Sequence, residues 1–172
     1  YQQSLEYINK SIQHDLIWAG PESDITAGRY LSKAFTLFDN QKPDSVSYFL
    51  IRTLEIRKRV FGDKNSFTYG AKRSLGEYFS MIEQYDSAAF YYHHGLMSLI
   101  KGFNNSNLFA NPRPTEIELN PDLVAGLVFK ASAIENLFKR DTSRIDLLDL
   151  SLKTYLLADS VFSIYHKGML HD

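Results

Sequence analysis

The hydrophobic and polar positions of this chain repeat every 42 residues. Three twelve-residue segments, which begin at Tyr1, Pro43 and Tyr85, carry small or apolar residues at the same places. Counted from Ser4 in the first segment, these places lie at offsets 0, 1, 4, 7 and 8, which trace one face of an α-helix. A repeat of this length is typical of stacked helical units, which build a surface rather than a catalytic pocket.

The same periodicity predicts an all-α chain of about seven helices. Their expected ranges are about 2–18, 25–40, 45–61, 67–83, 86–101, 121–140 and 144–167. Residue types at the helix ends predict the caps, because each type suits a particular position. We expect Ser23 or Asp24, Ser66 and Asn120 before helices, Pro43 and Pro121 in first turns, and Gly62 and Gly168 at helix ends.

The 42-residue period also divides the chain into units. We expect helical repeats over residues 1–101, with a partial unit at 1–20 and complete units at 21–62 and 63–101. Residues 102–120 are rich in Asn, Gly and Pro and lack helical periodicity, which predicts an irregular loop. Residues 121–172 are predicted to form a degenerate terminal helix pair. Its last helix is expected to carry an apolar face made of Leu148, Leu152, Tyr155, Ala158, Phe162 and Tyr165.

Residues 71–96 resemble the tetratricopeptide repeat (TPR). The resemblance rests on Leu75, Gly76, Phe79, Tyr85, Ala88, Tyr92 and Leu96. The usual repeat has about 34 residues. The period here is longer because of an extra stretch at the end of the unit, Leu54–Gly62. This longer repeat is similar to the variety in kinesin light chains and many bacterial repeat proteins. The resemblance implies a TPR-like α-solenoid of antiparallel helix pairs in a right-handed superhelix. Small residues such as Gly76 and Ala88 would let the two helices of a pair approach closely.

Residues 100–167 show a second resemblance. In these residues the end of a repeat is followed by Gly102-Phe103-Asn104-Asn105 and then by two further predicted helices. This layout is similar to the segment that joins TPR repeats to a CHAT domain in bacterial proteins. CHAT domains resemble caspases, and active ones use a His/Cys pair. The resemblance implies the regulatory arm of a larger TPR–CHAT protein, with the catalytic residues after Asp172. A chain that starts without Met and in mid-repeat also fits a fragment of a longer protein.

Composition narrows the classes of function. The net charge of −1 gives no electrostatic attraction to nucleic acid or anionic lipid. The sequence has no cysteine, which excludes disulfides, thiolate catalysis and cysteine-based zinc sites. No apolar run approaches the ~18 residues of a membrane-spanning helix. We therefore expect no nucleic-acid or membrane partner. The compartment stays open, with the cytoplasm favoured because no targeting signal is present.

Candidate catalytic and metal-binding residues have simpler structural explanations. His93 and His94 are adjacent on a predicted helix and point about 100° apart, so they do not bind one ion as an i, i+4 pair does. No serine has the context of an activated nucleophile, and no Gly-rich phosphate loop is present. We expect a non-enzymatic chain without cofactor or metal. The basic cluster Arg52, Arg57, Lys58 and Arg59 is interpreted as a solvated helix face, with contact to an acidic peptide as the alternative.

The TPR pattern places a ligand groove on the inner face of the first helix of each pair. Carried over position by position, it predicts the groove residues Leu31, Phe35 and Phe38, their counterparts Arg73, Glu77 and Ser80, and, in the terminal pair, Val128, Ser132 and Glu135. The alternative for Phe35 and Phe38 is packing against the preceding helix, since an aromatic stripe usually belongs to a core.

These patterns together predict a non-catalytic scaffold or regulatory arm that binds a protein or peptide in a concave groove. The alternative is a stand-alone TPR adaptor or peptide-sensing receptor without a protease domain. Because the first helix lacks its pair, we also expect weak self-association through truncated solenoid ends.

Overall fold

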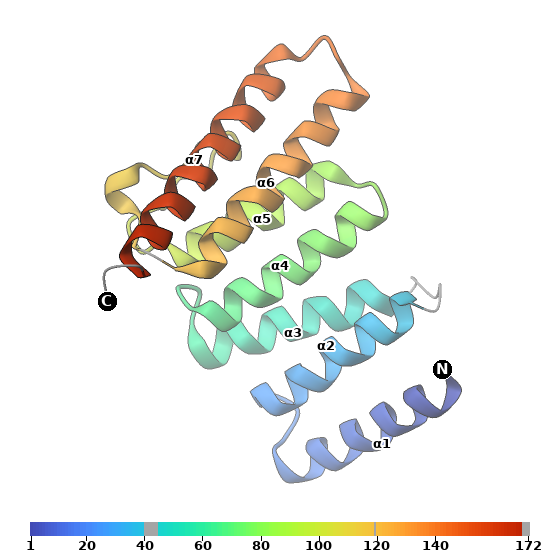
Figure 1. Ribbon diagram of the computed structural model, residues 1–172. Helices are drawn as coiled ribbons and strands as arrows, with labels where there is room; N and C mark the ends of the chain where they lie inside the picture. The colour runs from blue at the N-terminus through green and yellow to red at the C-terminus, as the bar shows by residue number, and fades with distance from the viewer. Residues whose placement is uncertain (40–44, 119, 170–172) are drawn as a thin grey trace. The chain divides into compact units, whose positions relative to one another are not determined.

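The structure is a computed structural model that describes residues 1–39, 45–118 and 120–169. Within these residues it contains seven α-helices, one short 3₁₀ helix (η2, Pro114–Glu116) and no strand (Figure 1). The α-helices are α1 (Gln2–Trp18), α2 (Asp24–Asp39), α3 (Val46–Phe61), α4 (Ser66–Met81), α5 (Tyr85–Leu99), α6 (Pro121–Arg140) and α7 (Ile145–Met169). The predicted all-α architecture is confirmed.

The chain divides into two compact units, Tyr1–Leu75 and Gly76–Asp172. In the first unit α2 packs against both α1 and α3, and in the second unit α6 packs against both α5 and α7. Within each unit, consecutive helices therefore lie side by side (Figure 1). The boundary between the units falls inside α4, whereas the predicted repeats end at residues 62 and 101.

Apolar side chains of α5, α6 and α7 form the core of the second unit. One cluster gathers around Leu96 and Leu127, and another around Tyr92 and Ile134. Gly76 lies directly against the ring of Tyr92, because an added Cβ would stand 2.5 Å from the ring atom Cε1. Glycine at position 76 therefore lets the backbone of α4 approach the Tyr92 ring more closely than a residue with a side chain would allow.

The other residues of the TPR-like pattern are buried or make ring contacts. Phe79 stacks on Tyr91, with ring centroids 5.4 Å apart. Tyr85 lies beneath the guanidinium of Arg140, whose central carbon is 4.6 Å from the ring centroid. Ala88 and Leu96 in α5 are fully buried, as is Leu75 in α4.

The turns before α2 and α4 repeat one hydrogen-bonding pattern, 42 residues apart. Gly20 and Gly62 have positive φ angles of 87° and 81°, in a region that favours glycine. The carbonyl of each glycine accepts a hydrogen bond from a threonine hydroxyl six residues later, at 2.8 Å from Thr26 and 2.7 Å from Thr68. The sequence period thus extends from the helix faces to the turns between them.

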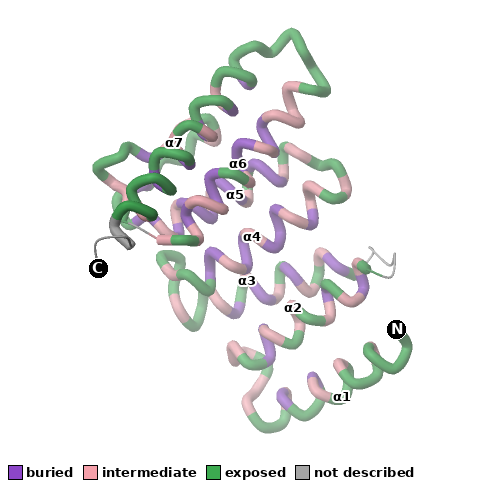
Figure 2. Tube along the Cα trace, viewed as in Figure 1, coloured by how far each residue is buried: buried purple, intermediate pink, exposed green. Residues whose placement is uncertain are grey.

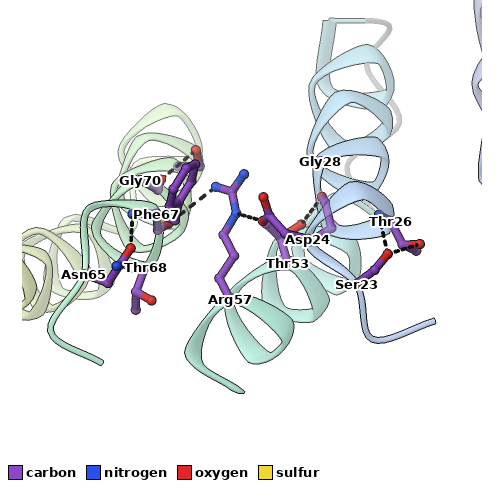
Figure 3. Close-up of polar contacts among 12 residues, drawn as sticks. Ser23, Asp24, Thr26, Gly28, Thr53, Arg57, Asn65, Phe67, Thr68 and Gly70 are labelled. Carbon is purple, nitrogen blue, oxygen red and sulfur yellow. Dashed lines mark hydrogen bonds and ion pairs between the residues drawn. The ribbon is translucent and has the colours of Figure 1, made fainter. Parts of the chain in front are cut away.

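The caps of these helices agree with most of the sequence predictions. Ser23 Oγ accepts a hydrogen bond from the backbone N–H of Thr26 (Figure 3), and Asn120 accepts one from that of Asp122. The prediction of Ser66 as a cap is wrong, because Asn65 Oδ1 accepts from the N–H of Phe67 (Figure 3). Gly168 does not end the last helix, which continues to Met169. Pro43 lies outside the described residues.

The apolar face predicted for α7 is wrong at three of its six residues. Leu148, Leu152 and Phe162 are exposed, and the side of α7 that faces the core is formed by Leu147, Ser151, Thr154, Ala158 and Val161. The physical reason is that α7 carries large apolar residues on several sides, so periodicity alone did not decide which side is buried.

Substituting Gly62 by alanine tests the shared turn. Gly62→Ala is expected to lower the free energy of unfolding by about 1–3 kcal/mol, the usual cost of holding a non-glycine residue in such a backbone region. The cause is the φ of 81° and ψ of 175°, since no atom lies within 4 Å of the added Cβ. Urea unfolding followed by circular dichroism measures the change.

Gly28→Ala is the matched control, because Gly28 lies within α2 and its added Cβ also meets no atom within 4 Å. This control is expected to be at least as stable as the unmodified chain, since alanine favours a helix over glycine. Equal stability of the two variants would contradict the strain assigned to Gly62.

Candidate functional site

The groove residues predicted for the first unit lie on α2. Leu31, Phe35 and Phe38 occupy one side of this helix, at i, i+4 and i+7. Leu31 and Phe38 are half-buried, whereas Phe35 is 39% exposed. Phe35 therefore offers an apolar edge to solvent, and the covered ring of Phe38 fits packing better than ligand contact.

Their predicted counterparts lie on one side of α4 with the same spacing. Arg73, Glu77 and Ser80 are all half-buried. The hydroxyl of Ser80 lies 3.5 Å from that of Tyr92 in α5. A role of these residues in ligand binding stays a prediction.

The residues predicted in the terminal pair lie on α6, and Val128 lines an open groove between α6 and α7. Val128 is 39% exposed, while Ser132 and Glu135 are half-buried. The groove has a cavity volume of about 380 Å³, and its walls are Pro121, Val124, Ala125, Val128, Phe129, Phe162 and Tyr165. It continues past Phe162 toward Tyr155, Ala158 and Asp159. Such a volume accommodates one or two apolar side chains of a partner.

Polar groups are confined to the edge of this groove. Tyr155 donates a 3.1 Å hydrogen bond to Glu135 Oε2, and burial together with this bond raises the pKa of the Tyr155 hydroxyl. Lys139 lies 2.6 Å from the same carboxylate, and its hydrogen bond lowers the pKa of Glu135. The chemistry of the groove is therefore apolar contact with an acidic edge, which suits binding rather than proton transfer.

A buried lysine forms the main polar cluster of the second unit. Lys130 lies on α6 with no exposed surface, and its ammonium nitrogen reaches three acceptors. It donates to the carbonyl of Ala110, to Asn111 Oδ1 at 3.1 Å and to His93 Nδ1 at 3.1 Å. Burial lowers the pKa of Lys130 to about 7, while three acceptors match the three N–H groups of the charged form.

The orientations of the neighbouring groups follow from their partners. His93 Nε2 lies 2.6 Å from the carbonyl of Asn105, which only accepts, so the ring proton is on Nε2 and Nδ1 is left to accept from Lys130. Thr154 donates to the carbonyl of Leu150 and accepts from Asn111 Nδ2 at 2.8 Å. This fixes Asn111 with Oδ1 toward Lys130. Burial, and after it the charge of Lys130, lowers the pKa of His93 to about 4.

This cluster holds the irregular segment after α5 against α5, α6 and α7. Asn105, Ala110 and Asn111 all belong to the segment that interrupts the repeat. Sequence analysis missed the cluster, although a signal was present. Lys130 lies on the same side of α6 as the apolar residues Leu123, Leu127 and Ile134, all of which are buried. A lysine in such a position is expected to be buried with them.

Acidic residues of the first unit neutralise the basic cluster of α3. The ion pairs are Arg52 with Glu22 and Glu55, Arg57 with Asp24 (Figure 3), Lys58 with Asp63, and Arg59 with Glu22. These contacts fit a solvated helix face. An acidic peptide would have to displace them.

The two adjacent histidines point in different directions. The ring planes of His93 and His94 are inclined by 86°, with centroids 5.7 Å apart. Among the described residues, no group of three or more His, Cys, Asp and Glu side chains is arranged to hold a metal ion. Over the same residues, no helix is long and apolar enough to cross a membrane.

Comparison with known proteins identifies the fold. No family model and no curated protein matches the chain. Among solved structures, it is similar to BtubC (BKLC) from P. vanneervenii, a kinesin light chain-like TPR protein, with a TM-score of 0.72 and 12% sequence identity. The match covers 94% of this chain and 56% of BtubC, so the chain spans little more than half of that protein. The likeness shows the fold alone, a TPR-like helical repeat of the α-solenoid class.

The stability of the chain is expected to fall as the pH drops from about 6.5 to about 4, in part because of His93. Its pKa in the folded chain is about 4, against 6.5 for the ordinary side chain. In this window the unfolded chain binds a proton that the folded chain excludes, so acid favours unfolding. Urea unfolding at a series of pH values measures the slope.

His93→Gln is expected to reduce this slope, because the variant keeps a donor for Asn105 but does not titrate. His94→Gln, one residue along the same helix, is the control, and its slope should stay steeper than that of His93→Gln. Equal slopes in the two variants would show that His93 does not carry the effect.

Proposed function

We propose that this chain is a non-catalytic scaffold that binds a protein or peptide, and that the groove between α6 and α7 holds apolar side chains of the ligand. The observation that carries the proposal is the open apolar groove itself. Val128 and Phe162 are 39% and 51% exposed within it, although both are large apolar residues. Exposed apolar surface that is concave and bordered by polar groups marks binding sites in soluble proteins.

The fold supports this proposal in a second way. Solenoids of helix pairs bury their apolar faces between neighbouring units and leave an extended surface for partners. The buried Lys130 cluster has no exposed surface at the lysine or at His93, so its chemistry is structural and not open to a substrate. The groove, by contrast, is open to solvent.

The resemblance of residues 100–167 to the segment before a CHAT domain supports a finer proposal. In it the scaffold is the regulatory arm of a caspase-like protease encoded after Asp172. The alternative is an adaptor or a peptide-sensing receptor without a protease. Reading the gene past the codon for Asp172 decides between them, since only the first proposal requires an α/β domain with a separated His and Cys.

Substituting Val128 by glutamate tests the groove. Peptides selected from a random display library against the purified chain are expected to bind Val128→Glu at least about tenfold more weakly, because a carboxylate in an apolar groove loses hydration without gaining a partner. Fluorescence anisotropy of the selected peptides gives both dissociation constants.

Val60→Glu is the matched control, because Val60 is 47% exposed on α3 and lies outside the groove. This variant should bind the selected peptides with unchanged affinity, and both variants should keep the helical circular dichroism of the unmodified chain. If selection yields no peptide, or if Val128→Glu binds as well as Val60→Glu, the groove is not the binding site.

A further inference from the structure

The wall of the apolar groove between α6 and α7 contains one carboxylate, that of Asp159. The groove has two adjoining parts, which share Val124, Val128 and Phe162. Among the described residues that line the two parts, Asp159 is the one that carries a charge, and it lies in the second part, which has a cavity volume of about 240 Å³. Asp159 is exposed, as is much of the visible side of α7 (Figure 2).

The carboxylate of Asp159 has no ion pair within the part of the chain that the structure describes. The nearest lysines along α7 do not supply one. Lys153 pairs with an aspartate four residues before it, and Lys167 lies eight residues after Asp159, or about 12 Å along the helix axis. On α6, Lys139 pairs with Glu135. In the free chain, Asp159 therefore has water as its partner.

A ligand that fills both parts of the groove covers the Asp159 carboxylate at least in part. An ionised carboxylate that loses water without gaining a partner is disfavoured, so a wholly apolar ligand is confined to the first part. An anionic ligand is repelled. A ligand that carries lysine or arginine beside its apolar side chain replaces the lost water with an ion pair. The groove thus favours one chemistry, an apolar side chain next to a cation.

We propose that the groove between α6 and α7 binds a peptide segment in which a large apolar residue lies within four positions of a lysine or arginine. The apolar side chain packs on Val128 and Phe162, and the cation pairs with Asp159. The spacing follows from the shared wall of the two parts, because neighbouring side chains on one face are three or four positions apart in a helix and two apart in a strand. This inference rests on the proposed function and names the chemistry of its ligand.

Two selections from one random display library test the proposal. One selection uses the unmodified chain, and the other uses Asp159→Lys. Peptides from the first are expected to be enriched in lysine or arginine within four positions of a large apolar residue. Peptides from the second are expected to be enriched in aspartate or glutamate at the same spacing, because reversing the charge of the wall reverses the charge that it attracts.

Dissociation constants give a second readout, for selected peptides whose binding is weakened by Val128→Glu. Asp159→Asn is expected to weaken the binding of these peptides about fivefold, as for a single ion pair at a surface, and the difference should shrink at high salt. Asp149→Asn is the matched control, because it makes the same change at an exposed position of α7 outside the groove. It should leave the affinity unchanged in fluorescence anisotropy.

Replacing the basic residue of a selected peptide by glutamate gives the reciprocal test. The changed peptide should bind the unmodified chain more weakly than the original peptide does, and it should regain affinity for Asp159→Lys. A change in the fold would not produce this exchange, since it depends on the pairing of two charges. Both variants of Asp159 are expected to keep the helical circular dichroism of the unmodified chain, because the side chain is exposed.

Two outcomes overturn the inference, and they differ in what they say about the groove. If no selected peptide depends on Val128, the groove does not bind peptides, and the proposed function fails together with the inference. If such peptides are found but bind Asp159→Asn as tightly as the unmodified chain, the groove is a peptide site and only the cation assigned to the ligand is wrong.

Discussion

Burial of an apolar helix face against the next helix in the chain is the interaction on which this structure depends. The strongest packing joins consecutive helices, α1 with α2 and α2 with α3 in one unit, and α5 with α6 and α6 with α7 in the other. Such a structure gains its stability locally, from each helix and its immediate neighbours.

The irregular segment after α5 breaks this scheme and is held by two kinds of contact. Phe103 and Ile117 pack into the apolar core, and Lys130 adds three hydrogen bonds, two of which reach Ala110 and Asn111 in the segment. A buried ammonium is costly unless its donors are all satisfied. Here they are, and His93 completes the arrangement by binding both Lys130 and Asn105. The polar cluster thus adds to the apolar contacts that hold this segment.

Open apolar surfaces of the second unit differ in shape. The groove beside Val128 is concave and has walls on both α6 and α7. It suits projecting side chains of a ligand. Ile145, Leu148, Leu152 and Leu156, on the outward side of α7, are exposed on a convex helix side.

The sequence by itself determined the helices and much of their packing. The 42-residue period identified the helix faces, and the residue types at helix ends identified caps at Ser23 and Asn120. These features depend on neighbours within one or two turns, so local patterns suffice to reveal them. The repeated turn at Gly20 and Gly62 was equally visible in the period, although it was not recognised.

Only the tertiary structure decided which side of α7 is buried, because apolar residues on several sides of that helix allow more than one choice. It also decided the state of Lys130. From its residue type alone, a lysine is expected to be exposed. The burial of Lys130 is favourable only because Ala110, Asn111 and His93 all accept hydrogen bonds from it. These three residues are 19 to 37 positions away from it in the chain. Partners that lie far apart in the chain leave no local sequence pattern. For this physical reason, the contacts of Lys130 could be found only in the tertiary structure.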